Sequence, residues 1–187
     1  GHGESALTPD LSMDSLSDML NHLLERLEIP EVVLVGHSMG GYISCRFAEK
    51  YSSKVKGLGL FHSSARADTP EIKENRRRTI EILEQNHGDF LMQFIPSLFF
   101  EGNKAGLEEE MEYLQKTASQ MSAESLIASM EAMAGRSGSL ELLTSAPIPI
   151  LFIIGKQDSR VDFNKVLAQD VLPEKSFILL LDNCGHM

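Results

Sequence analysis

Apolar residues follow two different spacings along this chain. Four short runs, at residues 32–36, 55–61, 150–154 and 176–181, are almost continuously apolar and rich in Val, Ile and Leu. Runs of this length and composition are typical of strands that are buried on both faces. Between the runs, apolar residues recur every three or four positions, which is the spacing of one helix face. Strands that alternate with helices predict an α/β fold, in which flanking helices cover a parallel sheet with right-handed crossovers.

The first helix is predicted from its cap and from its apolar face. Ser12 is a candidate N-cap, and Asp14 and Asp18 place negative charge near the positive end of the helix dipole. Pro30 ends this helix before the first strand begins. The side chains expected to face the core share the three- and four-residue spacing. They are Leu16, Met19, Leu20, Leu23, Leu24 and Leu27.

Residues 65–145 show helical spacing and no strand pattern. Thr69 as N-cap and Pro70 at the first helical position predict a helix that ends at Gly88. Pro96 is expected to bend or break the helix that follows. Met and Phe residues are frequent here, and their side chains either line an adaptable apolar pocket or simply pack the helices together.

The change of pattern divides the chain into three segments. Residues 1–64 form one part of an α/β core and contain a Gly-rich turn after the first strand. Residues 65–145 form a helical insertion, and residues 146–187 return to the strand–helix pattern of the core. The chain begins and ends abruptly, so we expect that it is cut at both ends. The first strand is then an exposed apolar edge, which a second copy of the chain in a homo-oligomer could cover.

Composition excludes several classes of partner. The 187 residues carry a formal net charge of −10, which makes a nucleic acid or an anionic membrane surface an improbable partner. No apolar run approaches the length that crosses a bilayer. The two cysteines, Cys45 and Cys184, give no disulfide framework, and we therefore expect a reducing, cytoplasmic location.

The turn Gly36-His37-Ser38-Met39-Gly40 is the strongest chemical signal in the chain. The pattern G-x-S-x-G between a strand and a helix predicts a nucleophile elbow. Gly36 and Gly40 are expected to be glycines because side chains there would collide across so tight a turn. The turn exposes the Ser38 hydroxyl near the N-terminus of a helix, where free N–H groups stabilise negative charge.

Three candidate catalytic residues follow the carboxyl ends of predicted strands. They are Ser38, Asp158 and His186, and parallel strands bring those ends to one edge of the sheet. A serine hydroxyl needs a base to remove its proton, and an imidazole can take that proton and return it to the leaving group. A carboxylate holds the imidazole tautomer and stabilises the imidazolium. Asp162 and Asp182 are alternative acids, but Asp158 lies directly at a strand end.

Three further residues have predicted roles around this edge. The backbone N–H of Met39 can donate to an oxyanion, and no second donor is evident in the sequence. His37 and His62 are expected to contact the substrate, although for His62, Ser63 and Ser64 a purely structural role is the favoured alternative. We predict no metal site and no cofactor.

The motifs together resemble the α/β-hydrolase superfamily, in particular its cap-bearing serine esterases, lipases and C–C hydrolases. The matching segments are residues 1–5, 36–41, 155–158 and 183–187. The resemblance implies that Ser38 is the nucleophile, His186 the base and Asp158 the acid, and that residues 65–145 form a cap over the site. A serine at position 38 argues against dehalogenase and epoxide hydrolase chemistry, which uses Asp there.

The resulting hypothesis is a serine hydrolase that cleaves a small, largely apolar carboxylic ester or thioester through an acyl-enzyme on Ser38. One alternative keeps the same triad in a C–C bond hydrolase or a cofactor-free perhydrolase. The other alternative is a non-catalytic binding module with a hydrolase fold. The superfamily's usual oxyanion segment, which precedes the loop at residues 1–5, has no counterpart in this sequence, and this favours the module; the complete triad opposes it.

Overall fold

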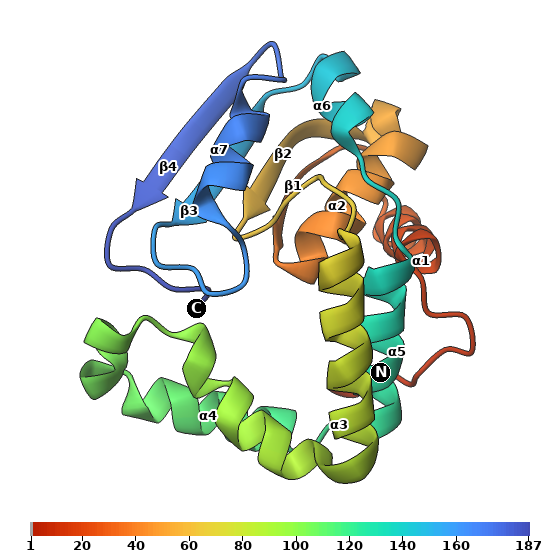
Figure 1. The fold of residues 1–187 in the computed structure, drawn as a ribbon. Helices are drawn as coiled ribbons and strands as arrows, with labels where there is room; N and C mark the ends of the chain where they lie inside the picture. Colours follow the sequence, from red (N-terminus) through yellow and green to blue (C-terminus); the bar gives the residue numbers. More distant parts are fainter. Residues whose placement is uncertain (1) are drawn as a thin grey trace.

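The structure is a computed structural model that describes residues 2–187. Its centre is a parallel sheet of four strands in the order β1-β2-β3-β4, so the strands lie side by side in chain order (Figure 1). Each neighbouring pair is parallel, which confirms the predicted fold class. The strands are β1 (Val32–His37), β2 (Val55–Phe61), β3 (Ile150–Gly155) and β4 (Ser176–Leu181).

Three helices belong to the core around the sheet. Helix α1 (Met13–Arg26) packs against α2 (Met39–Lys50), which connects β1 to β2 and contacts both strands. Helix α7 (Phe163–Asp170) connects β3 to β4 and packs mainly on β3. A short 3-10 helix, η1 (Ser52–Lys54), leads into β2. Within residues 2–187, no helix combines the length and the hydrophobicity that a membrane span requires.

The connection from β2 to β3 consists of helices. Figure 1 shows α3, α4 and α5 beyond the ends to which the strand arrows point, whereas α6 lies beside the core. Helices α3, α4 and α5 therefore extend from the carboxyl edge of the sheet, where the predicted catalytic residues lie. In chain order, the elements of the connection are α3 (Pro70–Phe94), η2 (Pro96–Leu98), η3 (Glu101–Gly106), α4 (Glu108–Ala118), α5 (Ala123–Gly135) and α6 (Leu140–Ser145).

Helix α3 differs from its prediction at its C-terminal part. It begins as expected, with Thr69 accepting a hydrogen bond from Ile72 N, but it does not end at Gly88. The helix kinks at Asn86, where φ is −160° and ψ is 79°, and then continues. The Asn86 side chain accepts a hydrogen bond from Asp89 N, as an N-cap does, and so restarts the helix after the kink.

A buried ion-pair cluster holds the helical segment against the core. The Asp68 carboxylate is almost fully buried and accepts from Arg76 at 2.6 Å and from Arg136 at 2.7 Å. The Arg136 guanidinium also lies 3.6 Å from the centre of the Tyr42 ring on α2. Because Arg76 is on α3 and Arg136 follows α5, this cluster links both helices to α2, the helix that follows Ser38.

The prediction that all four strands are buried on both faces is wrong for the two edge strands. Strands β2 and β3 supply the core, with Leu60 and Phe152 fully buried. In β1, by contrast, Val33 and Val35 are 67% and 59% exposed, because no described element covers that face. Strand β4 is exposed along most of its length, since α7 packs mainly over β3. The exposed edge expected at β1 is therefore present, and a homo-oligomer remains a prediction.

The packing of helix α1 is shifted from its predicted apolar face. Ser12 caps the helix as expected, through a reciprocal pair of hydrogen bonds with Ser15. Met19, Leu23 and Leu27 are nevertheless about half exposed, and the fully buried Ser17 faces α2 instead. Its hydroxyl lies 3.3 Å from the carbonyl oxygen of Ile43 on α2. A small residue at this contact lets the two helices approach closely, and this close approach sets the orientation of the helix.

Candidate active site

Ser38 lies at the tight turn between β1 and α2. Its φ of 50° and ψ of −117° are an uncommon conformation for a residue with a side chain, as expected for a nucleophile elbow. Two contacts from the end of β2 hold this conformation. Ser38 N donates to the carbonyl oxygen of Phe61 at 2.9 Å, and Ser63 Oγ donates to the carbonyl oxygen of Ser38 at 2.8 Å.

Of the two glycines that the elbow was predicted to require, the structure requires one, Gly36. A Cβ atom at Gly36 would lie 2.3 Å from backbone atoms of Gly40, so the turn requires glycine at position 36, as expected. At Gly40, however, an added Cβ would meet nothing within 4 Å. The crowded position is Gly41, where a Cβ would come within 2.5 Å of the Ser63 side chain. The second glycine that the elbow needs therefore lies one residue later than predicted.

We expect Gly36→Ala to disturb the elbow and Gly40→Ala to be tolerated. Overpacking against backbone costs about 1–3 kcal/mol of stability or more, so Gly36→Ala should lower both the melting temperature and any esterase activity. Gly40→Ala is the matched control, because helical Ala is favoured over Gly by about 1 kcal/mol. Thermal melting and ester hydrolysis measure both effects. A Gly36→Ala protein as stable and active as the wild type would contradict the role of this glycine.

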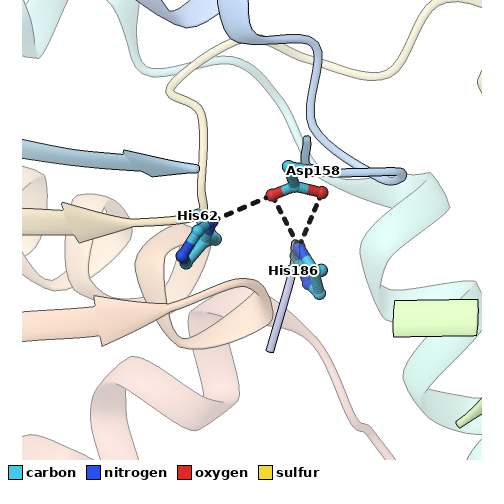
Figure 2. Close-up of side chains that lie close together, drawn as sticks. All are labelled: His62, Asp158 and His186. Atoms are coloured by element: carbon cyan, nitrogen blue, oxygen red, sulfur yellow. Dashed lines mark hydrogen bonds and ion pairs between the residues drawn. The ribbon is translucent and has the colours of Figure 1, made fainter. Parts of the chain in front are cut away.

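The three predicted catalytic side chains meet at the carboxyl edge of the sheet. His186 Nε2 lies 2.9 Å from Ser38 Oγ, and His186 Nδ1 lies 2.9 Å from Asp158 Oδ2. Figure 2 shows the Asp158 carboxylate turned toward the His186 ring, with both oxygens within reach of Nδ1. The side chains of His186 and Asp158 are 6% and 1% exposed. The chain of contacts from acid to base to hydroxyl is therefore complete, and its Asp158 and His186 members are shielded from water.

Hydrogen bonds keep the Asp158 carboxylate ionised. Burial alone raises the pKa of Asp158, but hydrogen bonds from His186 and His62 outweigh it and hold the pKa well below its usual value. The backbone N–H groups of Arg160 and Val161 donate to Oδ1 at 2.7 and 3.0 Å. An anionic carboxylate in this position can stabilise an imidazolium at His186.

The two alternative acids are engaged elsewhere. Asp162 is the N-cap of α7 and accepts from Asn164 N and Lys165 N. Asp182 pairs with Lys156 at 2.6 Å and is largely exposed. Neither carboxylate is hydrogen-bonded to His186 in the described structure, so the geometry favours Asp158 as the acid.

Two backbone contacts that the sequence did not indicate hold the His186 loop. His186 N and Met187 N both donate to the carbonyl oxygen of Leu98, at 2.8 and 3.1 Å. Leu98 belongs to η2 in the helical segment, so this segment directly supports the candidate base. Every residue has a backbone carbonyl, so the amino-acid sequence does not indicate this contact.

The two predicted substrate contacts, His62 and His37, have different surroundings in the structure. The side chain of His62 is 1% exposed, so it has no surface to offer a substrate, and Nδ1 lies 3.1 Å from Asp158 Oδ2. His37 is half-buried, and its Nε2–H donates to the carbonyl oxygen of His186 at 2.8 Å. Burial lowers the pKa of His37, which favours a neutral ring. The buried His62 therefore supports the site from behind, whereas a substrate contact by the half-buried His37 stays a prediction.

Met39 lies at the first position of α2, as the oxyanion prediction requires. A backbone N–H at this position has no acceptor within its own helix, so it is available to an oxyanion. The residue also lines a cavity of about 190 Å³ together with His2, Ser5 and Thr8. Thr8 Oγ1 is buried and has no hydrogen-bond partner within the part of the chain that the structure describes. The oxyanion role of Met39 stays a prediction.

His62, Asp158 and His186 could also be taken for metal ligands, because their ligand atoms lie within 4.8 Å of one another. The hydrogen bonds explain the cluster without an ion. Asp158 Oδ2 is shared by both Nδ1 atoms, and His186 Nε2 is directed at Ser38 Oγ. A metal ion bound by these three side chains would have to replace the hydrogen bonds between them.

A parallel sheet that gathers Ser, Asp and His in this chain order at its carboxyl edge defines an α/β-hydrolase. Within that class the chain belongs to the Ndr family, which matches residues 4–187. Its fold is also similar to a thermophilic esterase from Thermogutta terrifontis, with 32% identity and a TM-score of 0.91 over 100% of this chain and 70% of that one. An esterase from Exiguobacterium antarcticum shares the fold at 19% identity and a TM-score of 0.89, over 100% and 71% of the two chains.

Shorter similarities connect the chain to curated hydrolases. A stretch of 57 residues is 40% identical to the sn-1-specific diacylglycerol lipase ABHD11 of Danio rerio. It covers 30% of this chain and 18% of the lipase. A stretch of 65 residues is 37% identical to protein phosphatase methylesterase 1 of Candida albicans, over 32% of this chain and 18% of that protein. The chain thus aligns with less than a fifth of either enzyme, and any specific activity has to be argued from the site.

Proposed function

We propose that this protein is a serine hydrolase that cleaves a small, largely apolar carboxylic ester or thioester. The observation that carries the proposal is the unbroken contact chain from Asp158 through His186 to Ser38 Oγ. The elbow conformation of Ser38 supports the same assignment, because it is the conformation that a nucleophile at this turn adopts. The esterases among the similar structures are consistent with this reaction class.

The proposed reaction has two steps. His186 Nε2 accepts the Ser38 proton as Oγ attacks the substrate carbonyl, and Asp158 stabilises the imidazolium that results. The oxyanion accepts a hydrogen bond from Met39 N–H, and His186 gives its proton to the leaving alcohol or thiol. Water then attacks the acyl-enzyme, with His186 again as base. The products are a carboxylic acid and the alcohol or thiol, and Ser38 regains its proton.

An apolar cavity beside the candidate base supports a largely apolar substrate. It has a volume of about 430 Å³ and is lined by the apolar and aromatic side chains of Phe99, Tyr113, Leu114 and Met187, together with Glu109 and Glu110. Met187 is the residue after His186, and Phe99, Tyr113 and Leu114 belong to the helical segment. The cavity therefore lies between the helical segment and the residue that follows the candidate base. On this proposal, residues 65–145 act as a cap that supplies apolar surface to the substrate.

A panel of substrates tests the proposal against its alternatives. We expect hydrolysis of short nitrophenyl esters well above the rate with heat-denatured protein. A C–C hydrolase would instead cleave a diketone and leave these esters almost untouched, and a perhydrolase would form peracid from a carboxylic acid and hydrogen peroxide. Folded protein that is inactive toward every member of the panel would contradict the proposal and favour the non-catalytic module.

A further inference from the structure

Behind the triad lies a second histidine that the proposed reaction does not use. His62 follows the last residue of β2, and its side chain is 1% exposed. Its Nδ1 lies 3.1 Å from Asp158 Oδ2, the same oxygen that His186 Nδ1 contacts at 2.9 Å (Figure 2). The candidate acid is therefore held by two imidazoles, one on each side, and only one of them reaches Ser38.

The direction of the His62 hydrogen bond follows from the charge of its partner. Two groups face His62 Nδ1: Asp158 Oδ2 at 3.1 Å and the backbone N–H of Gly155 at 3.4 Å. An ionised carboxylate can only accept, and its contact is the shorter and the charged one, so we assign the proton to His62 Nδ1, which then cannot accept from Gly155 N. Asp158 then has four donors: the backbone N–H groups of Arg160 and Val161 at Oδ1, His62 Nδ1 at Oδ2, and His186 Nδ1, which lies within 3.1 Å of both oxygens. With backbone donors on one oxygen and the His62 donor on the other, the carboxylate cannot rotate without losing a contact.

The local backbone places His62 in this position. Its φ of 45° is an uncommon conformation that turns the chain sharply at the end of β2. Gly155 leaves space for the ring, because a Cβ there would lie 2.7 Å from His62 Cε1. The next residue, Ser63, donates to the carbonyl oxygen of Ser38. The end of β2 thus holds the candidate acid and the candidate nucleophile through adjacent side chains.

We propose that His62 is a positioning residue that donates a hydrogen bond to Asp158 and orients the carboxylate toward His186. This inference rests on the proposed function, since orientation of Asp158 matters only if the triad is active. Loss of the donor leaves Oδ2 with His186 as its one partner among the described residues, so the carboxylate can turn about Oδ1, which the backbone N–H groups of Arg160 and Val161 still hold. The effect is on the chemical step, because the buried His62 ring has no contact surface for a substrate.

Two amide substitutions separate the role of Nδ1 from simple packing. In His62→Asn the side-chain amide nitrogen lies near the position of Nδ1 and can still donate to Asp158. In His62→Gln the amide nitrogen extends toward the position of Nε2 instead. A third variant, His62→Leu, removes the donor, and Val55→Ala at the opposite end of β2 is a control for a general loss of stability, since Val55 is also buried.

We expect His62→Leu and His62→Gln to lower kcat by about 10- to 100-fold, the effect of one hydrogen bond to a charged group, with KM within about twofold of the wild type. His62→Asn should recover most of this loss. Rates are expressed per active site titrated with a fluorophosphonate, so that unfolded protein does not contribute. Proton NMR should also show that the downfield resonance of the His186–Asp158 hydrogen bond shifts in the Leu and Gln variants and returns in the Asn variant.

The outcomes separate this inference from the proposed function. A wild-type protein that neither labels nor hydrolyses esters overturns the proposed function, and the inference with it. An active wild type whose Leu, Gln and Asn variants keep full kcat overturns the inference alone. Equal losses in the Asn and Gln variants, matched by a similar loss in Val55→Ala, would show that His62 only packs the core and would also overturn it. Rescue by Asn but not by Gln supports the role of the Nδ1 donor.

Discussion

Ser38→Ala is expected to abolish ester hydrolysis, with a fall in kcat on the order of 10⁶-fold, the loss seen when a triad serine is removed. The reason is that only Ser38 Oγ lies within hydrogen-bond distance of His186 Nε2, at 2.9 Å, in the described structure. Alanine keeps the elbow backbone but has no atom that can form an acyl-enzyme. Steady-state hydrolysis of a nitrophenyl ester measures the loss.

A serine elsewhere on the chain is the matched control for this substitution. Ser53 is exposed in η1, near the start of β2 and at the far end of the strand from the site. Ser53→Ala should keep wild-type kcat and KM. If Ser38→Ala retained more than a few per cent of the activity while still folding, the acyl-enzyme route through Ser38 would be contradicted.

Asp158→Asn is expected to have the second largest effect, a fall in kcat on the order of 10⁴-fold with little change in stability. An amide in place of the carboxylate can donate to His186 Nδ1, which favours the wrong tautomer and leaves Nε2 unable to accept the Ser38 proton. It also removes the negative charge that stabilises the imidazolium. The pH dependence of kcat/KM and thermal melting separate this catalytic loss from unfolding.

Asp162→Asn and Asp182→Asn are the controls for this second prediction. Asn is as good an N-cap as Asp, so α7 should keep its start in Asp162→Asn. The ion pair of Asp182 with Lys156 is solvent-exposed, and its loss should matter little. Both variants should retain wild-type rates. A large loss in either one, with Asp158→Asn unaffected, would move the role of acid to that residue.

The sequence predicted which side chains meet better than it predicted the packing around them. The proximity of Ser38, Asp158 and His186 could be predicted because a nucleophile elbow, strand ends and chain order are all local signals that a parallel sheet converts into proximity. Their catalytic roles stay a prediction. The exposure of Val33 on β1 could not be predicted in the same way. A run of apolar residues favours burial, but it does not indicate which element covers the strand. The burial of Ser17 on α1 depends likewise on a partner helix.

The supporting contacts were the part of the site that sequence reasoning missed. A histidine at a strand end has the same signal whether it faces a substrate or lies behind the acid, and only the three-dimensional structure, which buries the His62 side chain against Asp158, decides between the two. The carbonyl of Leu98 that holds the His186 loop has no residue-type signal at all. Gly41 differs from Gly40 only by the proximity of Ser63, which comes from another strand.

Labelling with a fluorophosphonate, followed by peptide mass spectrometry, tests the central claim most directly. The reagent bonds only to a serine whose proton a neighbouring base can remove, so it reports the activated hydroxyl without knowledge of the substrate. The account predicts one adduct, on the peptide that contains Ser38, and no adduct when His186 is replaced by Ala. Native, folded protein that stays unlabelled, or that is labelled at another serine, would contradict it.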